Sequence, residues 1–217
     1  MINTTNIKNN NIASVNNIIN KINSDITGRV CKTDYLHNLL YLKQNNNIRT
    51  YVETGVYFGG SMCLILQDDK PCHHIGIDIF DGYYGDNKPD LFSSDICSID
   101  VTRKNIDNNN PHKHKVDLVK GSSYSQDTIN KVKQLTDKID LLLIDGDHTI
   151  KGVSGDYLGY KDLISLGGII VFDNYGEPET WPEVKEAVDN IDFNKDGFEP
   201  LGQYGWSYIV RRKTFNH

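Results

Sequence analysis

The stretch Lys138–Gly176, KIDLLLIDGDHTIKGVSGDYLGYKDLISLGGIIVFDNYG, carries the pattern that decides the fold. Two apolar runs within it, Ile139–Ile144 and Gly168–Phe172, are too short for helices, and each ends at an aspartate. Continuous apolar runs of this length are typical of parallel strands that are buried on both faces. The segment between them is long enough for one crossover helix. The stretch therefore predicts two neighbouring strands of a parallel α/β sheet.

Polar side chains follow both of these strands. Asp145 comes directly after the first strand, and Asp173 and Asn174 come directly after the second. Neighbouring strands lie about 4.8 Å apart, so we expect the three side chains to share one small volume. Hard oxygen donors of this kind favour a divalent cation such as Mg²⁺. Taken singly, a strand-end aspartate more often caps a helix or starts a turn, so the metal hypothesis depends on the three lying together.

The rest of the chain alternates short apolar runs with amphipathic segments, which is typical of a doubly wound α/β fold. Further strands are expected at 49–53, 74–79 and 115–119. Helices are expected at 60–68, 95–108, 125–135, 152–166 and 182–190, with Gly167–Gly168 as the stop of the fourth. Residues 198–203 and 206–211, joined by a Tyr-Gly turn, predict an antiparallel hairpin. The expected fold is Rossmann-like, with a mostly parallel seven-stranded sheet and this hairpin at its C-terminal edge.

The amino-terminal part differs in composition from the rest. Residues 1–30 are rich in asparagine, with apolar residues near helical spacing at Ile12, Val15, Ile19 and Ile22. We expect a segment that is partly disordered or helical. A firmer helix is predicted over residues 33–44. With no internal repeat or linker, residues 31–217 are expected to form one domain.

Size and charge exclude several classes of protein. A chain of 217 residues suits one α/β domain, and its net charge of −6 argues against a general nucleic-acid binder. No apolar run approaches the roughly 18 residues that span a bilayer, and the amino terminus lacks the apolar core of a secretory signal. The four cysteines form no CxxC pair. We therefore expect reduced thiols, a cytoplasmic location and no membrane partner.

A glycine-rich turn, YVETGVYFGGSM at residues 51–62, follows the first strand. Its spacing is G-x-x-x-G-G, which differs from the G-x-G-x-x-G of dinucleotide-binding proteins and argues against an NAD-dependent oxidoreductase. Glu53 suits a ligand with an ammonium group better than a pyrophosphate. Asp78, at the end of the second strand, is placed to bind the hydroxyls of a ribose. The segment KGSSYSQD at residues 120–127 offers small hydroxyl side chains to a flat base. S-adenosylmethionine contains all three groups.

Over about residues 33–212, these motifs resemble the class I S-adenosylmethionine-dependent, metal-dependent O-methyltransferases, which include catechol O-methyltransferase. The resemblance implies that one set of residues binds the cofactor: Glu53, Gly55, Tyr57, Gly59, Ser61, Asp78, Ser123 and Asp145. Within this set, Asp78 would bind the ribose and Ser123 would lie near the adenine. The resemblance also implies that Asp145, Asp173 and Asn174 bind the metal.

His148 stands where the catechol branch of the family has a lysine base. IDGDH is more similar to the branch of macrolide-sugar and rhamnosyl O-methyltransferases, together with proteins labelled cephalosporin hydroxylases. We therefore expect His148 to act as the catalytic base on a small-molecule acceptor, with a sugar or glycoside ahead of a catechol or phenol. A non-catalytic cofactor-binding scaffold is the alternative of another class. A homo-oligomer is possible.

Several aromatic residues are weaker candidates for the acceptor pocket. Tyr83, Tyr84 and Tyr175 lie in or next to polar loops, where aromatic side chains often serve packing alone. Trp181 and Trp206 either line the acceptor site or close the core. The sequence leaves both interpretations open.

Overall fold

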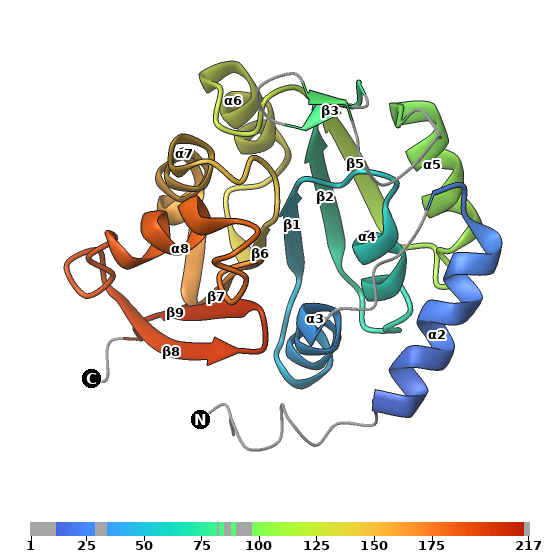
Figure 1. Ribbon diagram of the computed structural model, residues 1–217. Helices are drawn as coiled ribbons and strands as arrows, with labels where there is room; N and C mark the ends of the chain where they lie inside the picture. Colours follow the sequence, from blue (N-terminus) through green and yellow to red (C-terminus); the bar gives the residue numbers. More distant parts are fainter. Residues whose placement is uncertain (1–11, 29–33, 82, 85–87, 90–96, 215–217) are drawn as a thin grey trace.

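The computed structural model describes residues 12–28, 34–81, 83–84, 88–89 and 97–214. Its main sheet has seven strands in the order β5-β2-β1-β6-β7-β9-β8 (Figure 1). Their bounds are β1 Thr50–Thr54, β2 His73–Asp78, β5 Lys115–Lys120, β6 Ile139–Ile144, β7 Ile164–Phe172, β8 Phe198–Tyr204 and β9 Ser207–Arg212. The five strands β5, β2, β1, β6 and β7 run parallel to one another, and β9 pairs antiparallel with both β7 and β8. The expected fold class is confirmed.

Helices cover both faces of this sheet (Figure 1). One face carries α2 Ile12–Asp25, α3 Asp34–Asn45, α4 Gly60–Ile65 and α5 Ile99–Asn108. The other carries α6 Gln126–Leu135, α7 Ile150–Tyr160 and α8 Pro182–Asp189. Strand β6 serves both layers, because Leu141 and Leu143 enter the first core while Leu142 and Ile144 enter the second. This explains why its sequence is continuously apolar from Leu141 to Ile144 instead of alternating. A small added pair, β3 Tyr83–Tyr84 and β4 Lys88–Pro89, was not predicted.

The expected end of the fourth helix at Gly167–Gly168 is wrong. Helix α7 ends at Tyr160, a 3-10 turn covers Lys161–Leu163, and β7 begins at Ile164, ahead of both glycines. The two glycines instead form an irregularity inside the strand, where the pairing with β6 shifts register. Gly167 has φ +77°, a backbone angle that glycine adopts without strain. The glycines therefore mark a bulge. In the sequence, a glycine in a strand bulge looks the same as a glycine that ends a helix.

The amino-terminal segment forms a helix, α2, that is part of the same core. Val15, Ile19 and Ile22 of α2 are buried with residues of α3 and α4. After α2, the backbone N–H and C=O of Thr27 both bond the side chain of Asn105, which also donates to the carbonyl of Phe58. This amide fastens the segment to the rest of the fold. Residues 1–11 lie outside the described residues, and the division at residue 30 stays a prediction.

No helix in the described ranges is long and apolar enough to cross a membrane. The described cysteines, Cys63, Cys72 and Cys97, are buried thiols. Cys31 lies outside the described residues.

An ion pair is buried between α3 and the turn that follows α4. The Lys43 ammonium lies 2.7 Å from a carboxylate oxygen of Asp68, and the two side chains are 0% and 5% exposed. The ammonium also donates to the carbonyl of Lys70 at 3.1 Å. The pair links the helix that precedes the sheet to the helix that follows the glycine-rich turn.

Lys43→Met should lower the free energy of unfolding by about 3 kcal/mol, because it leaves a buried carboxylate without its counter-charge. Urea denaturation followed by circular dichroism measures this loss. Lys21→Met, on the exposed side of α2, is the matched control and should change stability by less than about 0.5 kcal/mol. Equal effects of the two substitutions on the free energy of unfolding would show that the ion pair contributes nothing to stability.

Candidate active site

The predicted polar residues meet at the carboxyl edge of the parallel strands. Strands β6 and β7 end opposite one another, with Ile144 paired to Phe172. The pairing continues past both ends, because the N–H of Asp173 donates to the carbonyl of Ile144 and the N–H of Asp145 donates to the carbonyl of Thr54. The two aspartates therefore leave adjacent strands side by side, as the sequence predicted.

His148 joins this group from the loop that precedes α7. Its Nε2 lies 2.7 Å from Oδ1 of Asn174 and 3.6 Å from Oδ1 of Asp145. Two local features place these side chains. Thr149 caps α7 by accepting the N–H of Gly152, which ends the loop just after His148. Asn174 has φ +56°, which turns the chain sharply after β7.

Burial shifts the pKa values of the titratable groups in this site. Asp173 is 4% exposed and its Oδ1 has no hydrogen-bond partner. Burial, and after it the charge of Asp145, raise the pKa of Asp173 well above its ordinary range. Burial lowers the pKa of His148, but the hydrogen bond and charge of Asp145 outweigh it, so the net shift is upward. A buried carboxylate with an unpaired oxygen, beside the partly exposed carboxylate of Asp145, favours a nearby positive charge.

The donor set fits a hard divalent cation by its chemistry. Two carboxylates and one amide oxygen are the ligand types that Mg²⁺ and Ca²⁺ prefer. In the part of the chain that the structure describes, no three His, Cys, Asp or Glu side chains are grouped to hold a metal ion. The fit therefore rests on Asp145 and Asp173 with the amide of Asn174, and metal binding stays a prediction.

Glu53 lies under the glycine-rich turn, at the end of β1. Its carboxylate is 0% exposed and accepts hydrogen bonds from the hydroxyls of Tyr51 and Ser61. Burial raises the pKa of Glu53 to about 8, although both hydrogen bonds act against this shift. The predicted contacts of Glu53 and Ser61 with the cofactor stay predictions, since the two side chains bind each other here.

The turn itself brings two strand ends into direct backbone contact. Gly55 has φ +84°, and a Cβ built on it would lie 1.9 Å from the carbonyl oxygen of Asp145. Gly59, with φ +86°, precedes the first residue of α4. The carboxylate of Asp78 accepts the N–H groups of Tyr57 and Phe80 at 2.8 and 2.7 Å, which ties the turn to the end of β2. Burial raises the pKa of Asp78 to about 6.

A second polar group, which the sequence did not single out, lies beneath the same edge. Asp156 of α7 is 0% exposed, and its carboxyl group lies beside the hydroxyls of Ser123 and Thr54. Burial raises the pKa of Asp156 to about 7, and the hydroxyls of Ser123 and Thr54 oppose this shift. The carbonyl of Ser123 accepts the hydroxyl of Tyr160 at 2.7 Å. The available signal was an aspartate on the apolar face of α7, spaced with Val153 and Tyr160.

The aromatic candidates separate into different environments. The ring of Trp181 stacks on His148, with centroids 4.3 Å apart and planes at 26°. Tyr175 is buried and donates its hydroxyl to Asp189 on α8. Trp206 is 37% exposed in the turn between β8 and β9. The side chains of Tyr83 and Tyr84 lie outside the described residues. Of the described candidates, Trp181 directly contacts the predicted base.

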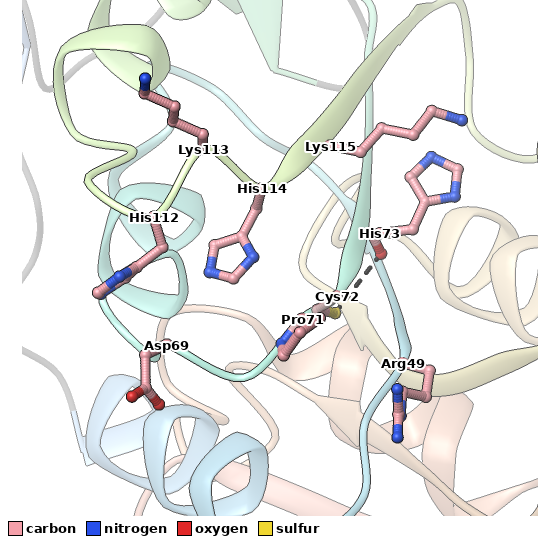
Figure 2. A pocket seen from close by; sticks show the side chains of 9 residues that line it. All are labelled: Arg49, Asp69, Pro71, Cys72, His73, His112, Lys113, His114 and Lys115. Atoms are coloured by element: carbon pink, nitrogen blue, oxygen red, sulfur yellow. Dashed lines mark hydrogen bonds between the residues drawn. The ribbon is translucent and has the colours of Figure 1, made fainter.

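A hollow of about 510 Å³ lies at the opposite edge of the sheet, where β2 and β5 begin (Figure 2). Its lining residues are Arg49, Asp69, Pro71, Cys72, His73, His112, Lys113, His114 and Lys115. The side chains of Lys113 and Lys115 point in different directions (Figure 2). Asp117 lies 2.7 Å from His73 and 3.2 Å from Lys115. The two lysines therefore do not converge on one ligand, and Asp117 partly neutralises Lys115. The hollow is for this reason a weaker candidate for the active site than the carboxyl edge.

Gly55→Ala should lower the free energy of unfolding by several kcal/mol, since the new methyl group strains the backbone and collides with the carbonyl of Asp145. Gly197→Ala is the matched control, because Gly197 has φ +82° with nothing within 4 Å of the added carbon. It should lose only the strain, about 1–2 kcal/mol. Urea denaturation of both variants isolates the cost of the contact. Equal losses would contradict the close approach.

Glu53→Gln should flatten the pH dependence of stability. The folded protein holds the Glu53 proton up to about pH 8, whereas the ordinary pKa is 4.5. Stability from this group is therefore complete at low pH and falls as the pH rises through that window, by about 1.4 kcal/mol per pKa unit. Urea denaturation at pH 5 and pH 8 measures the slope. If the wild type and the Gln variant lose the same stability, Glu53 has no raised pKa.

Comparison with known families places this edge in context. Residues 52–175 match the family described as a methyltransferase domain. An uncharacterized protein of Acanthamoeba polyphaga mimivirus is 33% identical over 162 residues, which are 71% of this chain and 67% of that protein.

Solved structures of methyltransferases share the fold. The O-methyltransferase NovP has a TM-score of 0.65 at 22% identity, over 83% of this chain and 80% of its own. The calicheamicin methyltransferase CalS11 has a TM-score of 0.61 at 14% identity, over 92% and 91%. An O-methyltransferase from Bacillus cereus in complex with S-adenosylhomocysteine has a TM-score of 0.60 at 14% identity, over 94% and 90%. The family match covers more than half of the chain and includes both the glycine-rich turn and the strand-end aspartates, so the chain belongs to the methyltransferase-domain family.

Proposed function

We propose that this methyltransferase transfers the methyl group of S-adenosylmethionine to a hydroxyl of a sugar or glycoside, assisted by a divalent cation and by His148 as base. The observation that carries the proposal is the gathering of His148, Asp145, Asp173 and Asn174 at one edge. This edge adjoins the glycine-rich turn through the contact between Gly55 and Asp145. An acid-base group, a set of oxygen donors and a backbone turn that can orient the methyl donor are the parts that transfer to oxygen requires.

The cofactor is assigned to the turn and the two strand ends beside it. Gly55, Tyr57 and Gly59 all have positive φ, and the turn that they form would hold the donor, while Asp78 offers a carboxylate at the end of β2 for ribose hydroxyls. Ser123, whose carbonyl accepts the hydroxyl of Tyr160, would lie near the adenine. The bound sulfonium would supply the methyl group. The residues of the chain would orient it toward the acceptor, which contributes up to about 7–11 kcal/mol in well-aligned systems.

The cation is assigned to Asp145, Asp173 and Asn174. A bound Mg²⁺ would lower the pKa of a hydroxyl that coordinates it. Without it, one oxygen of the buried Asp173 has no partner, and burial together with the charge of the nearby Asp145 raises the pKa of Asp173. His148 lies within reach of the same volume and would receive the proton of the acceptor.

The acceptor is assigned on chemical grounds and by analogy. CalS11 is described as a TDP-rhamnose 3'-O-methyltransferase, which shows that this fold can methylate a sugar hydroxyl. Sugar hydroxyls are far less acidic than phenols, so a site with both a cation and a histidine base suits them. A catechol would use the same edge and is the second candidate. We assign the reaction to a reducing compartment such as the cytoplasm, since the described cysteines are buried thiols.

The test is methyl transfer from S-adenosylmethionine to a panel of nucleotide sugars, glycosides and catechols, with and without a chelator. We expect activity on at least one glycoside, its loss in the chelator and its recovery with Mg²⁺. Asp173→Ala should lower kcat by at least about a hundredfold, while S-adenosylhomocysteine still binds in calorimetry. Asp107→Ala, at an exposed position of α5, is the control and should keep full activity. Full activity in the chelator would refute the role of the cation.

A further inference from the structure

The side-chain amide of Asn174 lies between two partners of different chemistry. Its Nδ2 donates to a carboxylate oxygen of Glu177, three residues later in the same loop. Its Oδ1 lies 2.7 Å from Nε2 of His148. The loop is held independently, because the N–H of Glu177 donates to the carbonyl of Asn174 at 3.1 Å and the N–H of Gly176 donates to the carbonyl of Trp206. Both polar atoms of the amide therefore have a hydrogen-bond partner.

The chemistry of Glu177 decides which way this amide faces. A carboxylate accepts hydrogen bonds and has none to donate, so the amide atom beside it must be the NH₂ group. The opposite atom, which faces His148, is then the carbonyl oxygen. This oxygen accepts hydrogen bonds and has none to donate.

The orientation of the amide in turn decides the proton of His148. Facing the carbonyl oxygen of Asn174 at 2.7 Å, Nε2 must carry a hydrogen and donate it. The nearest carboxylate oxygen of Asp145, 3.6 Å from the same nitrogen, is also an acceptor and favours the same arrangement. In the neutral ring, the lone pair then resides on Nδ1.

We propose that Glu177 is a positioning residue which orients the amide of Asn174 and thereby places the ring proton of His148 on Nε2, which leaves Nδ1 as the ring nitrogen that can accept a proton. The proposal rests on the proposed function for the role of Nδ1, but the proton arrangement stands by itself. In the transfer, the acceptor oxygen bonds the methyl carbon while the carbon–sulfur bond breaks, and its electron pair stays on sulfur. The proton of the acceptor hydroxyl passes to Nδ1.

Trp181 completes the arrangement by fixing the plane of the ring. Its indole stacks on the imidazole at 4.3 Å and 26°, and the backbone N–H of Trp181 donates to the backbone carbonyl of Glu177 at 2.8 Å. The side chain of Glu177 acts on His148 through the Asn174 amide alone, and the backbone bond holds the loop that carries Trp181. The same orientation turns the Asn174 oxygen inward, as a metal ligand requires.

Nitrogen NMR of histidine-labelled protein without ligands tests the arrangement directly. Spectra are recorded at a pH where the ring is neutral, and His148→Gln assigns the resonances. The wild type should show a protonated Nε2 and a lone pair on Nδ1. Glu177→Gln should keep this pattern, since the glutamine oxygen still accepts from Nδ2. Glu177→Leu should lose it and lower kcat by roughly tenfold to a hundredfold, with the affinity for S-adenosylhomocysteine within about twofold of wild type.

Glu179→Leu, at an exposed position of the same loop, is the matched control and should leave spectrum and kcat unchanged. A lone pair on Nε2 in the wild type, or a wild-type spectrum in Glu177→Leu, would overturn the proposal. If Glu177→Leu fails to fold, the wild-type and Glu177→Gln spectra still decide. Absence of methyl transfer by the wild type would refute the proposed function and leave the proton arrangement to the spectra.

Discussion

Direct backbone contact between the Gly55 turn and the carbonyl of Asp145 is the constraint on which the site depends. No side chain fits between them, because an added Cβ would lie 1.9 Å from that carbonyl oxygen. The contact joins the strand that leads to the predicted donor site with the strand that starts the acidic loop. Two sites that the sequence separates by some ninety residues thereby become one edge.

Buried acids dominate this edge. Burial raises the pKa values of Glu53, Asp78, Asp156 and Asp173; Glu53, Asp78 and Asp173 lie at strand ends, and Asp156 lies on α7. Keeping several carboxyl groups out of water costs stability unless they are protonated, hydrogen-bonded or matched by positive charge. Both ligands expected here are positively charged: the cofactor carries an ammonium and a sulfonium group, and the metal is a divalent cation. The acidity of the edge thus fits the ligands assigned to it.

Much of the fold could be predicted because strand length and apolar content report burial on both faces. The run Ile139–Ile144 appears with its predicted bounds, and the strand-end aspartates meet as expected. The double-glycine position was misread, since a helix stop and a strand bulge use the same residue for the same φ. Glu177 and Asp156 were missed because their roles come from contacts made across the fold. Periodicity places a residue on a face but does not name its partner.

The side chain of Asn105 donates to the carbonyl of Thr27, in the segment that follows α2. It also donates to the carbonyl of Phe58, next to Tyr57 of the glycine-rich turn. Gly28 packs on the ring of Phe58 so closely that a Cβ there would lie 2.3 Å from a ring carbon. The segment that follows α2 is thus coupled to the glycine-rich turn through Asn105 and Phe58. A change that displaces α2 would therefore reach the turn through these two side chains.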